Sequence, residues 1–392
     1  MSDSIVKTTS VSWFERIKQS VLGALIGFIL VLGAVVLLFW NEGRTVTTAR
    51  SLAEGASAVV AVPSQEINPA NEGRLVHISG TVTTDEILAD EEFGIEVEGI
   101  RLVRTVEMYQ WHESTSEETK KTLGGGEETV TTYSYSKAWS DEPIDSSRFE
   151  QPAGHDNPSM ELESDVFQVS EARINAFALD DTVLDEIGDG RALKLSSDQQ
   201  RAIEAAWSGY EKVTFADGAV YLGDNPKKPA VGDYRVRYEL VPLGPVSVVG
   251  KQTGNSFQAY QTRAGDRLLL VESGSVPADT MFANAASENT LLSWIIRAAG
   301  LVVLMIGFAM MMQPLGVIAD VIPLLGDVVR LGTGLAAFLF TIIVGTATIA
   351  IAWFYYRPLL ALGVLVVGGA ITVALVRFFK ARKKPAAASV VA

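Results

Sequence analysis

The sequence contains no cysteine among its 392 residues. Without cysteine the chain has no disulfide framework, no thiolate metal site and no cysteine nucleophile. Histidine is nearly as scarce, since only His77, His112 and His155 occur and no two of them have the spacing of a metal-binding pair. Metal ligation by histidine is therefore a weak hypothesis, and we expect no cofactor.

Recognisable catalytic motifs are missing as well. The glycine run at 124–126 lacks the lysine and the following helix of a phosphate-binding loop, and no nucleophile elbow or zinc-hydrolase string occurs. His155 lies in GHDNP, a turn composition, where a hydrogen-bonded loop histidine is the favoured interpretation. We expect a protein that is not an enzyme. A membrane-anchored hydrolase stays open if histidines or carboxylates converge in space.

Charged residues are nearly absent from four long stretches. Residues 21–40 are apolar and uncharged, and as a helix they would extend about 30 Å, the thickness of the hydrocarbon core. A cleaved signal peptide would have a shorter apolar core. Further apolar blocks cover 291–312, 331–354 and 358–376. The predicted fold class is a multi-pass α-helical membrane protein with four transmembrane helices.

Basic residues flank the first and the last span. They are Lys7, Arg16 and Lys18 before the first, and Arg377, Lys380, Arg382, Lys383 and Lys384 after the last. The positive-inside rule then predicts a cytoplasmic N-terminus, 1–20, and a cytoplasmic basic tail, 377–392. The region between the first two spans, 41–290, would be periplasmic in a bacterial inner membrane, or luminal in the endoplasmic reticulum or inner nuclear membrane. Residues 313–330 are expected to lie in the cytoplasmic interface, to fold back as a re-entrant turn, or to form an apolar connecting loop.

The region 41–290 is strongly acidic. Most of the acidic residues fall between 41 and 294, where the net charge is −21, against −14 for the whole chain. Such a field repels phosphate backbones and favours basic partners, cations or simple solubility. We therefore expect no nucleic-acid partner.

Alternating polarity in this region indicates strands. Residues 231–241 and 129–139 alternate between apolar and polar side chains, 101–111 suits a partner strand, and the polar linker 114–128 would form a hairpin tip. Further strands are expected at 74–83, 245–251 and 266–273, with short helices at 180–187 and after a capping box of Ser197 with Gln200. These patterns predict an antiparallel β-rich α+β domain outside the cytoplasm, formed by one or two β units.

Arg297 is the only charged residue inside a predicted span. An intramembrane charge is a functional candidate, which either pairs with a carboxylate or snorkels to the interface. The spans hold no other ionisable group that could carry ions or protons. Gly23 and Gly27, at GxxxG spacing, and Gly363 are expected to support close helix packing.

Several long strings occur in one order along the chain: WNEGR (40–44), NEGRLVHISG (71–80), VEMYQW (106–111), GHDNP (154–158), VGDYRV (231–236), AGDRLLL (264–270), WIIRAAG (294–300) and YRPL (356–359). In these strings the chain resembles the transmembrane protein 43 family, also called LUMA. The resemblance implies a four-span protein with a large luminal domain, self-association, contacts with membrane or nuclear-envelope proteins and no enzymatic activity. A bacterial homologue would have a periplasmic domain. The family defines no catalytic residues, so none are transferred.

The function predicted from these observations is a non-enzymatic membrane scaffold. It would contact membrane lipids, form homo-oligomers and organise membrane or envelope structure through protein partners. The alternative is an extracytoplasmic sensor or binding module for a lipid or an envelope component, which predicts a concave apolar pocket in the β-rich domain.

Overall fold

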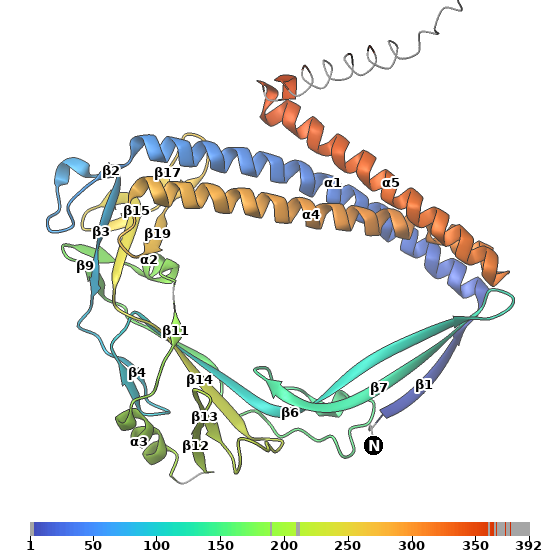
Figure 1. Cartoon of the computed structure of the whole chain (residues 1–392), viewed down its shortest axis with the longest axis horizontal. Helices are drawn as coiled ribbons and strands as arrows, with labels where there is room; N and C mark the ends of the chain where they lie inside the picture. Colours follow the sequence, from blue (N-terminus) through green and yellow to red (C-terminus); the bar gives the residue numbers. More distant parts are fainter. Residues whose placement is uncertain are drawn as a thin grey trace, which may run out of the picture. The chain divides into compact units, whose positions relative to one another are not determined.

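The computed structural model describes residues 4–188, 190–208, 212–359 and 361–363, and the single positions 366, 373 and 377. The chain forms two compact units (Figure 1). The β unit comprises Ser51–Lys121, Glu127–Ala286 and the N-terminal segment up to Val11. The helical unit comprises Ser12–Arg50, Thr122–Gly126 and the chain from Ser287 onward.

Three helices in the described part of the chain are long and apolar enough to cross a membrane. They are α1 (Trp13–Ala58), α4 (Ala278–Ala319) and α5 (Pro323–Tyr356). Helices α1 and α4 have 46 and 42 residues, so each extends well beyond its predicted span. The predicted fourth span, 358–376, and the basic tail, 377–392, lie mostly outside the described residues.

The segment 313–330 is mostly helical. Helix α4 continues to Ala319, α5 begins at Pro323, and only a short turn separates them. Proline is favoured in the first turn of a helix because its missing N–H would be unpaired there in any case. At the other end α5 stops at Tyr356, since the residue before Pro358 disfavours helical geometry. The break predicted at YYRP therefore marks a real helix end.

Helices α1 and α4 approach each other closely at Gly27 and Gly307. A Cβ atom placed on Gly27 would lie 2.6 Å from the backbone oxygen of Gly307. A Cβ on Gly23 would meet Gln313 Oε1 at 3.1 Å, whereas one on Gly363 would meet no described atom within 4 Å. Gly27 therefore serves packing within the chain.

The larger sheet of the β unit has eight strands, all paired antiparallel. Its order is β1 (Ser4–Val11), β7 (Glu127–Ser140), β6 (Arg101–Lys121), β14 (Tyr234–Val241), β13 (Ala219–Leu222) and β12 (Val213–Ala216), with β8 (Asp165–Gln168) paired to β6 and β11 (Arg191–Ala192) to β14. Strands β6 and β7 form the predicted hairpin. Their pairing extends to Lys121 and Glu127, so the tip is far shorter than the predicted linker 114–128.

A second sheet has seven strands. Its order is β10 (Phe177–Leu179), β9 (Ala172–Ile174), β3 (Leu75–Thr83), β15 (Pro245–Thr253) and β16 (Ser256–Gln258), with β2 (Val60–Ala61) parallel to β3 and β19 (Leu270–Ser273) paired to β15. Two small ribbons, β4 (Leu88–Asp90) with β5 (Ile95–Val97) and β17 (Tyr260–Gln261) with β18 (Arg267–Leu268), complete the strands.

The β unit also contains short helices: η1 (Pro69–Asn71), η2 (Ser146–Arg148), α2 (Asp181–Glu186) and α3 (Ser197–Ala206). The capping box of α3 joins Ser196 and Gln199, one residue earlier than the predicted pair. One main cluster of buried side chains includes Ile78 of β3, Val248 of β15, Leu102 of β6 and Val236 of β14. Because this core joins both sheets, residues 51–286 form one β domain.

Strand β1 was not expected. Residues 4–11, predicted as part of a cytoplasmic terminus, pair with β7 along their whole length, from Ser4 opposite Ser134 to Val11 opposite Glu127 (Figure 1). Lys7 Nζ also lies 2.6 Å from Glu150 Oε1. The N-terminal segment is thus an edge strand of the β unit.

Candidate functional site

One carboxylate joins the three long helices. Glu42 of α1 is fully buried, and its oxygens accept hydrogen bonds from Arg297 Nε at 2.6 Å and Nη2 at 2.8 Å. Trp353 Nε1 of α5 donates to the same carboxylate at 2.9 Å. The two-point contact suits the planar guanidinium fork and fixes the direction of both side chains. We call Glu42, Arg297 and Trp353 the Glu42 cluster.

A polar seam between α1 and α4 extends this cluster. Asn41 Nδ2 donates to the backbone oxygen of Ser293 at 3.1 Å, and Arg44 Nη1 donates to Asn289 Oδ1 at 3.0 Å. The Arg297 guanidinium also lies over the ring of Trp294, 4.8 Å from its centroid. Arg297 is therefore paired inside the helical unit, which distinguishes it from a snorkelling side chain. A buried ion pair needs such additional contacts because removing both charges from water is costly.

A second buried carboxylate lies in the turn between α4 and α5. Asp320 is fully buried and accepts hydrogen bonds from Arg16 Nη2 and Arg330 Nη1, both at 2.8 Å. Arg16 Nη1 also donates to the backbone oxygen of Gly125 in the hairpin tip, and Trp13 Nε1 donates to that of Val317 at 2.9 Å. Arg16, Asp320 and Arg330 form the Asp320 cluster, which fixes the start of α1 to the α4–α5 turn.

Neither cluster offers a group for catalysis. Both carboxylates accept from guanidinium donors, so neither is poised as a nucleophile or general base. Among the residues that the structure describes, no three histidine, aspartate or glutamate side chains gather to hold a metal ion. His77 Nε2 contacts the backbone oxygen of Val276 at 2.9 Å, and His155 stacks on Tyr135 with its Nδ1 2.9 Å from the backbone oxygen of Gln151. Each of these two histidines has a structural contact.

Two arginines of β14 form ion pairs with one glutamate of β6 in the large sheet. Arg235 Nε and Nη2 donate to Glu107 at 2.8 and 2.7 Å, and Arg237 bonds to the same carboxylate. Burial raises the pKa of Glu107, but the hydrogen bonds and charges of the two arginines outweigh this effect, and the net pKa lies below the ordinary value. Glu107 therefore contributes to stability in its charged form.

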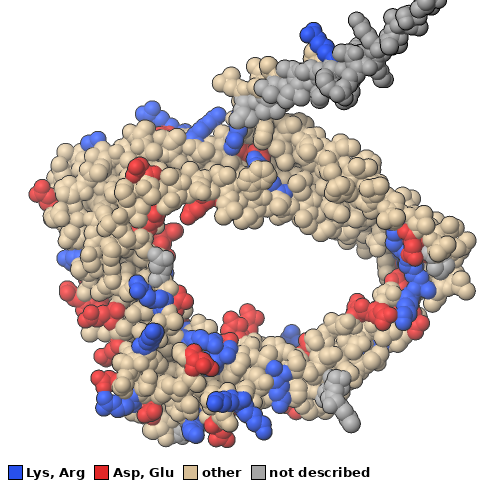
Figure 2. Space-filling view, viewed as in Figure 1, with Lys and Arg blue, Asp and Glu red and all other residues tan. Residues whose placement is uncertain are grey.

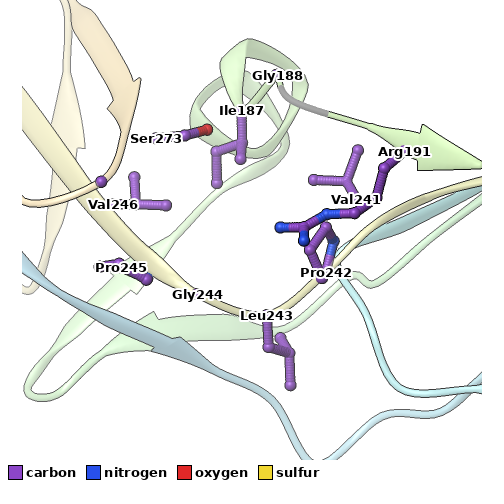
Figure 3. A pocket seen from close by; sticks show the side chains of 11 residues that line it. Ile187, Gly188, Arg191, Val241, Pro242, Leu243, Gly244, Pro245, Val246 and Ser273 are labelled. Carbon is purple, nitrogen blue, oxygen red and sulfur yellow. The ribbon is translucent and has the colours of Figure 1, made fainter.

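Two cavities lined by described residues of the β unit are large enough for a small ligand. The first, about 360 Å³, is lined by residues 241–246 together with Ile187, Arg191 and Ser273, and Figure 3 shows the Arg191 side chain reaching into it. The second, about 420 Å³, is lined by Glu92, Glu161, Leu162, Ala206, Trp207, Leu222, Gly232 and Tyr234. The second combines aromatic and aliphatic walls with two carboxylates, a lining that fits an amphiphile with a cationic end.

The outer faces of the helices are apolar. Leu22, Ile29 and Leu331 are 60%, 66% and 79% exposed, and Figure 2 shows few charged side chains along α1 and α4 against many over the strands. Apolar surface on this scale needs a cover of lipid or protein. The fold and its buried ion pairs thus define an integral membrane protein that carries a large, acidic, β-rich domain.

Comparison with known proteins identifies the family. Residues 108–358 match the family Transmembrane protein 43. Transmembrane protein 43 of Homo sapiens is 35% identical over 370 residues, which cover 91% of this chain and 90% of the human protein. The Transmembrane protein 43 homolog of Drosophila melanogaster is 30% identical over 355 residues, covering 88% and 92%. The chain belongs to the transmembrane protein 43 family. No solved structure matches it.

Sequence reasoning found Arg297 but missed its partner. Glu42 lies just beyond the predicted first span, within WNEGR, where a carboxylate has the appearance of an ordinary interfacial residue. Asp320 lies within the apolar segment 313–330, and its cationic partners could not be identified from the sequence. In both cases the available signal was a lone acidic residue beside a long apolar run, since such a residue needs a cationic partner if it is buried.

Proposed function

We propose that this chain is a non-enzymatic membrane scaffold that self-associates and organises membrane or envelope structure through protein partners. The observation that carries the proposal is the Glu42 cluster, in which one buried carboxylate ties α1, α4 and α5 together. The charges of Glu42 and Arg297 hold the helices to one another, and a scaffold needs helices that keep a fixed arrangement. A reactive or transporting site would need groups that change partners or protonation.

Two surfaces are suited to partners. Helix α5 exposes Leu331, Leu335 and Phe338, with exposed fractions of 79%, 61% and 47%, and this apolar face fits lipid or the helices of a second copy. The β unit has a strong negative charge, which favours proteins with basic surfaces. The close-packed face around Gly27 is occupied by α4, so we assign self-association to α5 instead.

The proposed location follows from the charge pattern and the family. The basic residues between Arg377 and Lys384 favour a cytoplasmic C-terminus. In a bacterium the membrane would be the inner membrane of the envelope, and in a eukaryote the endoplasmic reticulum or inner nuclear membrane.

Self-association is tested with two full-length copies that carry different tags. Membranes are solubilised mildly and one tag is captured. We expect the copy that carries the other tag to be captured with it. A copy with charged replacements on the exposed face of α5, Leu335→Lys with Phe338→Lys, should lose this co-capture, and Gly33→Ala serves as a matched helical control. Absence of co-capture with the unmodified pair, together with a monomeric mass in detergent, would refute self-association.

The alternative function, a sensor or binding module, is favoured by one observation, the cavity between Trp207 and Tyr234. Its lining fits a lipid or amphiphile with an amine headgroup. Native mass spectrometry of the purified protein tests this alternative. The sensor function requires that an amphiphile is bound to the unmodified chain. This amphiphile should be lost from the Trp207→Ala variant and retained by the Trp13→Phe variant.

A further inference from the structure

A cavity of about 330 Å³ lies within the helical unit, between α1 and the end of α5. Its lining combines two arginines with apolar and aromatic residues and contains no acidic residue. The lining residues are Val46, Arg50, Tyr356, Arg357, Pro358 and Leu359. A positively charged cavity with apolar walls is thus formed by one unit of the protein.

Aromatic packing holds the end of α5 against α1. A Cβ atom on Gly43 would lie 2.6 Å from Cζ of Tyr356, so a larger residue at this position would displace the tyrosine ring. The ring of Tyr356 also lies 5.4 Å from that of Phe39, measured between centroids. These contacts fix residues 356–359 beside α1, and the cavity is therefore formed without a ligand.

The two arginines have donors to spare. Arg50 Nη2 donates to the backbone oxygen of Tyr356 at 3.2 Å, which leaves the remaining N–H donors of this guanidinium available. The acidic residues nearest to Arg50 along α1, Glu42 and Glu54, accept hydrogen bonds from other groups. In the part of the chain that the structure describes, the Arg357 side chain has neither a hydrogen bond nor an ion pair. Both positive charges therefore lack a counter-ion among the described residues.

The cavity lies at the end of an apolar span. Helix α5 stops at Tyr356, and its last turns expose Ile351, Phe354 and Tyr355, with exposed fractions of 62%, 50% and 73%. Tyrosine is enriched where hydrocarbon meets the lipid headgroups, so the end of α5 marks this level of the bilayer. Leu359, in the cavity wall, is 86% exposed. A guanidinium at this level meets lipid phosphates, and an apolar wall meets acyl chains.

From these observations we propose that the cavity binds the headgroup of an anionic phospholipid. The phosphate lies between Arg50 and Arg357, because the planar guanidinium fork matches phosphate geometry. Val46, Pro358 and Leu359 contact the upper part of an acyl chain. Basic pockets between membrane helices bind lipid headgroups through the same combination of charge and apolar contact. This site is independent of self-association and of the cavities in the β unit.

Native mass spectrometry of the purified full chain tests the proposal. The protein in detergent is titrated with phosphatidylglycerol or with phosphatidylcholine that carries the same acyl chains. We expect the first phosphatidylglycerol to bind about tenfold more tightly, because only this lipid has a net negative charge for the two arginines to neutralise. Equal affinities for the two lipids would overturn the proposal.

A pair of double variants locates the site. Arg50→Gln with Arg357→Gln should abolish the preference for phosphatidylglycerol. Arg148→Gln with Arg201→Gln is the matched control, because it removes the same charge from side chains that are 85% and 74% exposed in the β unit. The basic residues of 377–384 are present in every variant, so their attraction for anionic lipid is common to all. A preference that survives in the first variant, or falls equally in the control, would contradict the site.

Two further measurements separate a lipid site from a site for soluble phosphate and from a misfolded variant. Glycerol 3-phosphate in excess should not displace the bound lipid, since it lacks acyl chains, and displacement would overturn the choice of a lipid. Phosphatidylglycerol should raise the melting temperature of the unmodified chain more than phosphatidylcholine does, because a ligand of the folded state stabilises it. Equal melting temperatures in the two lipids would count against the site without any variant.

Discussion

The guanidinium of Arg297 donates two hydrogen bonds to the carboxylate of Glu42, at 2.6 and 2.8 Å, across 255 residues of sequence. This contact places the two charges in a fixed geometry, with Trp353 completing the carboxylate's donors. In a low-dielectric interior the pair is held by its own attraction and by these hydrogen bonds. Its main consequence is that α1, α4 and α5 are joined through one carboxylate.

Glu42→Gln should destabilise the protein by about 3–5 kcal/mol, because it leaves the buried Arg297 charge without a counter-ion. Thermal unfolding in detergent measures the change. Asp198→Asn is the control, since Asp198 is 86% exposed and pairs with an exposed arginine, where about 0–1 kcal/mol is expected. The double variant Glu42→Gln with Arg297→Gln should lose less than the two single losses combined. Equal shifts for the Glu42 and Asp198 variants would contradict a role for this pair in stability.

Gly27→Ala should destabilise the contact between α1 and α4. Its Cβ would lie 2.6 Å from the backbone oxygen of Gly307, so the helices must move apart, at a cost of about 1–3 kcal/mol. Gly33→Ala in the same helix is the matched control. A Cβ there meets nothing within 4 Å, and alanine should leave stability unchanged or raise it by up to about 1 kcal/mol. The reverse order of the two melting temperatures would show that the helices are packed differently.

Asp320→Asn should loosen the joint between the start of α1 and the α4–α5 turn. Asp320 is fully buried between Arg16 and Arg330, and its neutralisation leaves two guanidinium groups with a weaker acceptor. We expect a loss of about 3 kcal/mol or more, measured by thermal unfolding. Asp327→Asn is the comparison, because the Asp327 side chain is 68% exposed and lies 3.6 Å from Arg330. Similar losses for both variants would mean that Asp320 does not act through its burial.

Glu107 gives the β domain an acid-sensitive contribution. Its folded-state pKa lies below its ordinary value, so this contribution is present at pH above the unfolded pKa and is lost as the pH falls through the folded pKa. Glu107→Gln should therefore lower stability at neutral pH and flatten the decline between about pH 5 and the acid limit. Urea unfolding is followed by tryptophan fluorescence at pH values from about 3 to about 7. It measures the stability at neutral pH and its decline toward acid pH. An unchanged acid decline in the variant would place the sensitivity elsewhere.

Periodicity allowed much of the fold to be predicted. The uncharged runs located α1, α4 and α5, and the alternation in 101–111, 129–139 and 231–241 located three neighbouring strands of one sheet. The capping box was placed one residue late because SSDQQ offers two serines, each with a glutamine three positions later. Local patterns of this kind predict that a helix or strand is present more reliably than they predict the residue at which it ends.

The long-range partners could not be predicted from sequence. Nothing local links Glu42 to Arg297, and a single carboxylate after an apolar run has the same pattern whether it is solvated or buried. Strand β1 was missed because SIVKTTSV is short, contains a lysine and stands directly before an apolar helix. Its pairing depends on β7, which lies more than one hundred residues further along the chain. Both relationships exist only in the folded chain.

The most direct test of the scaffold function counts copies in the membrane itself. Full-length protein carrying one fluorophore per chain is reconstituted at low density in lipid bilayers, and the photobleaching steps of each spot are counted. Self-association predicts spots with several steps, which fall to single steps with Leu335→Lys and Phe338→Lys and persist with Gly33→Ala. Single-step spots from the unmodified chain at every density would contradict the scaffold account.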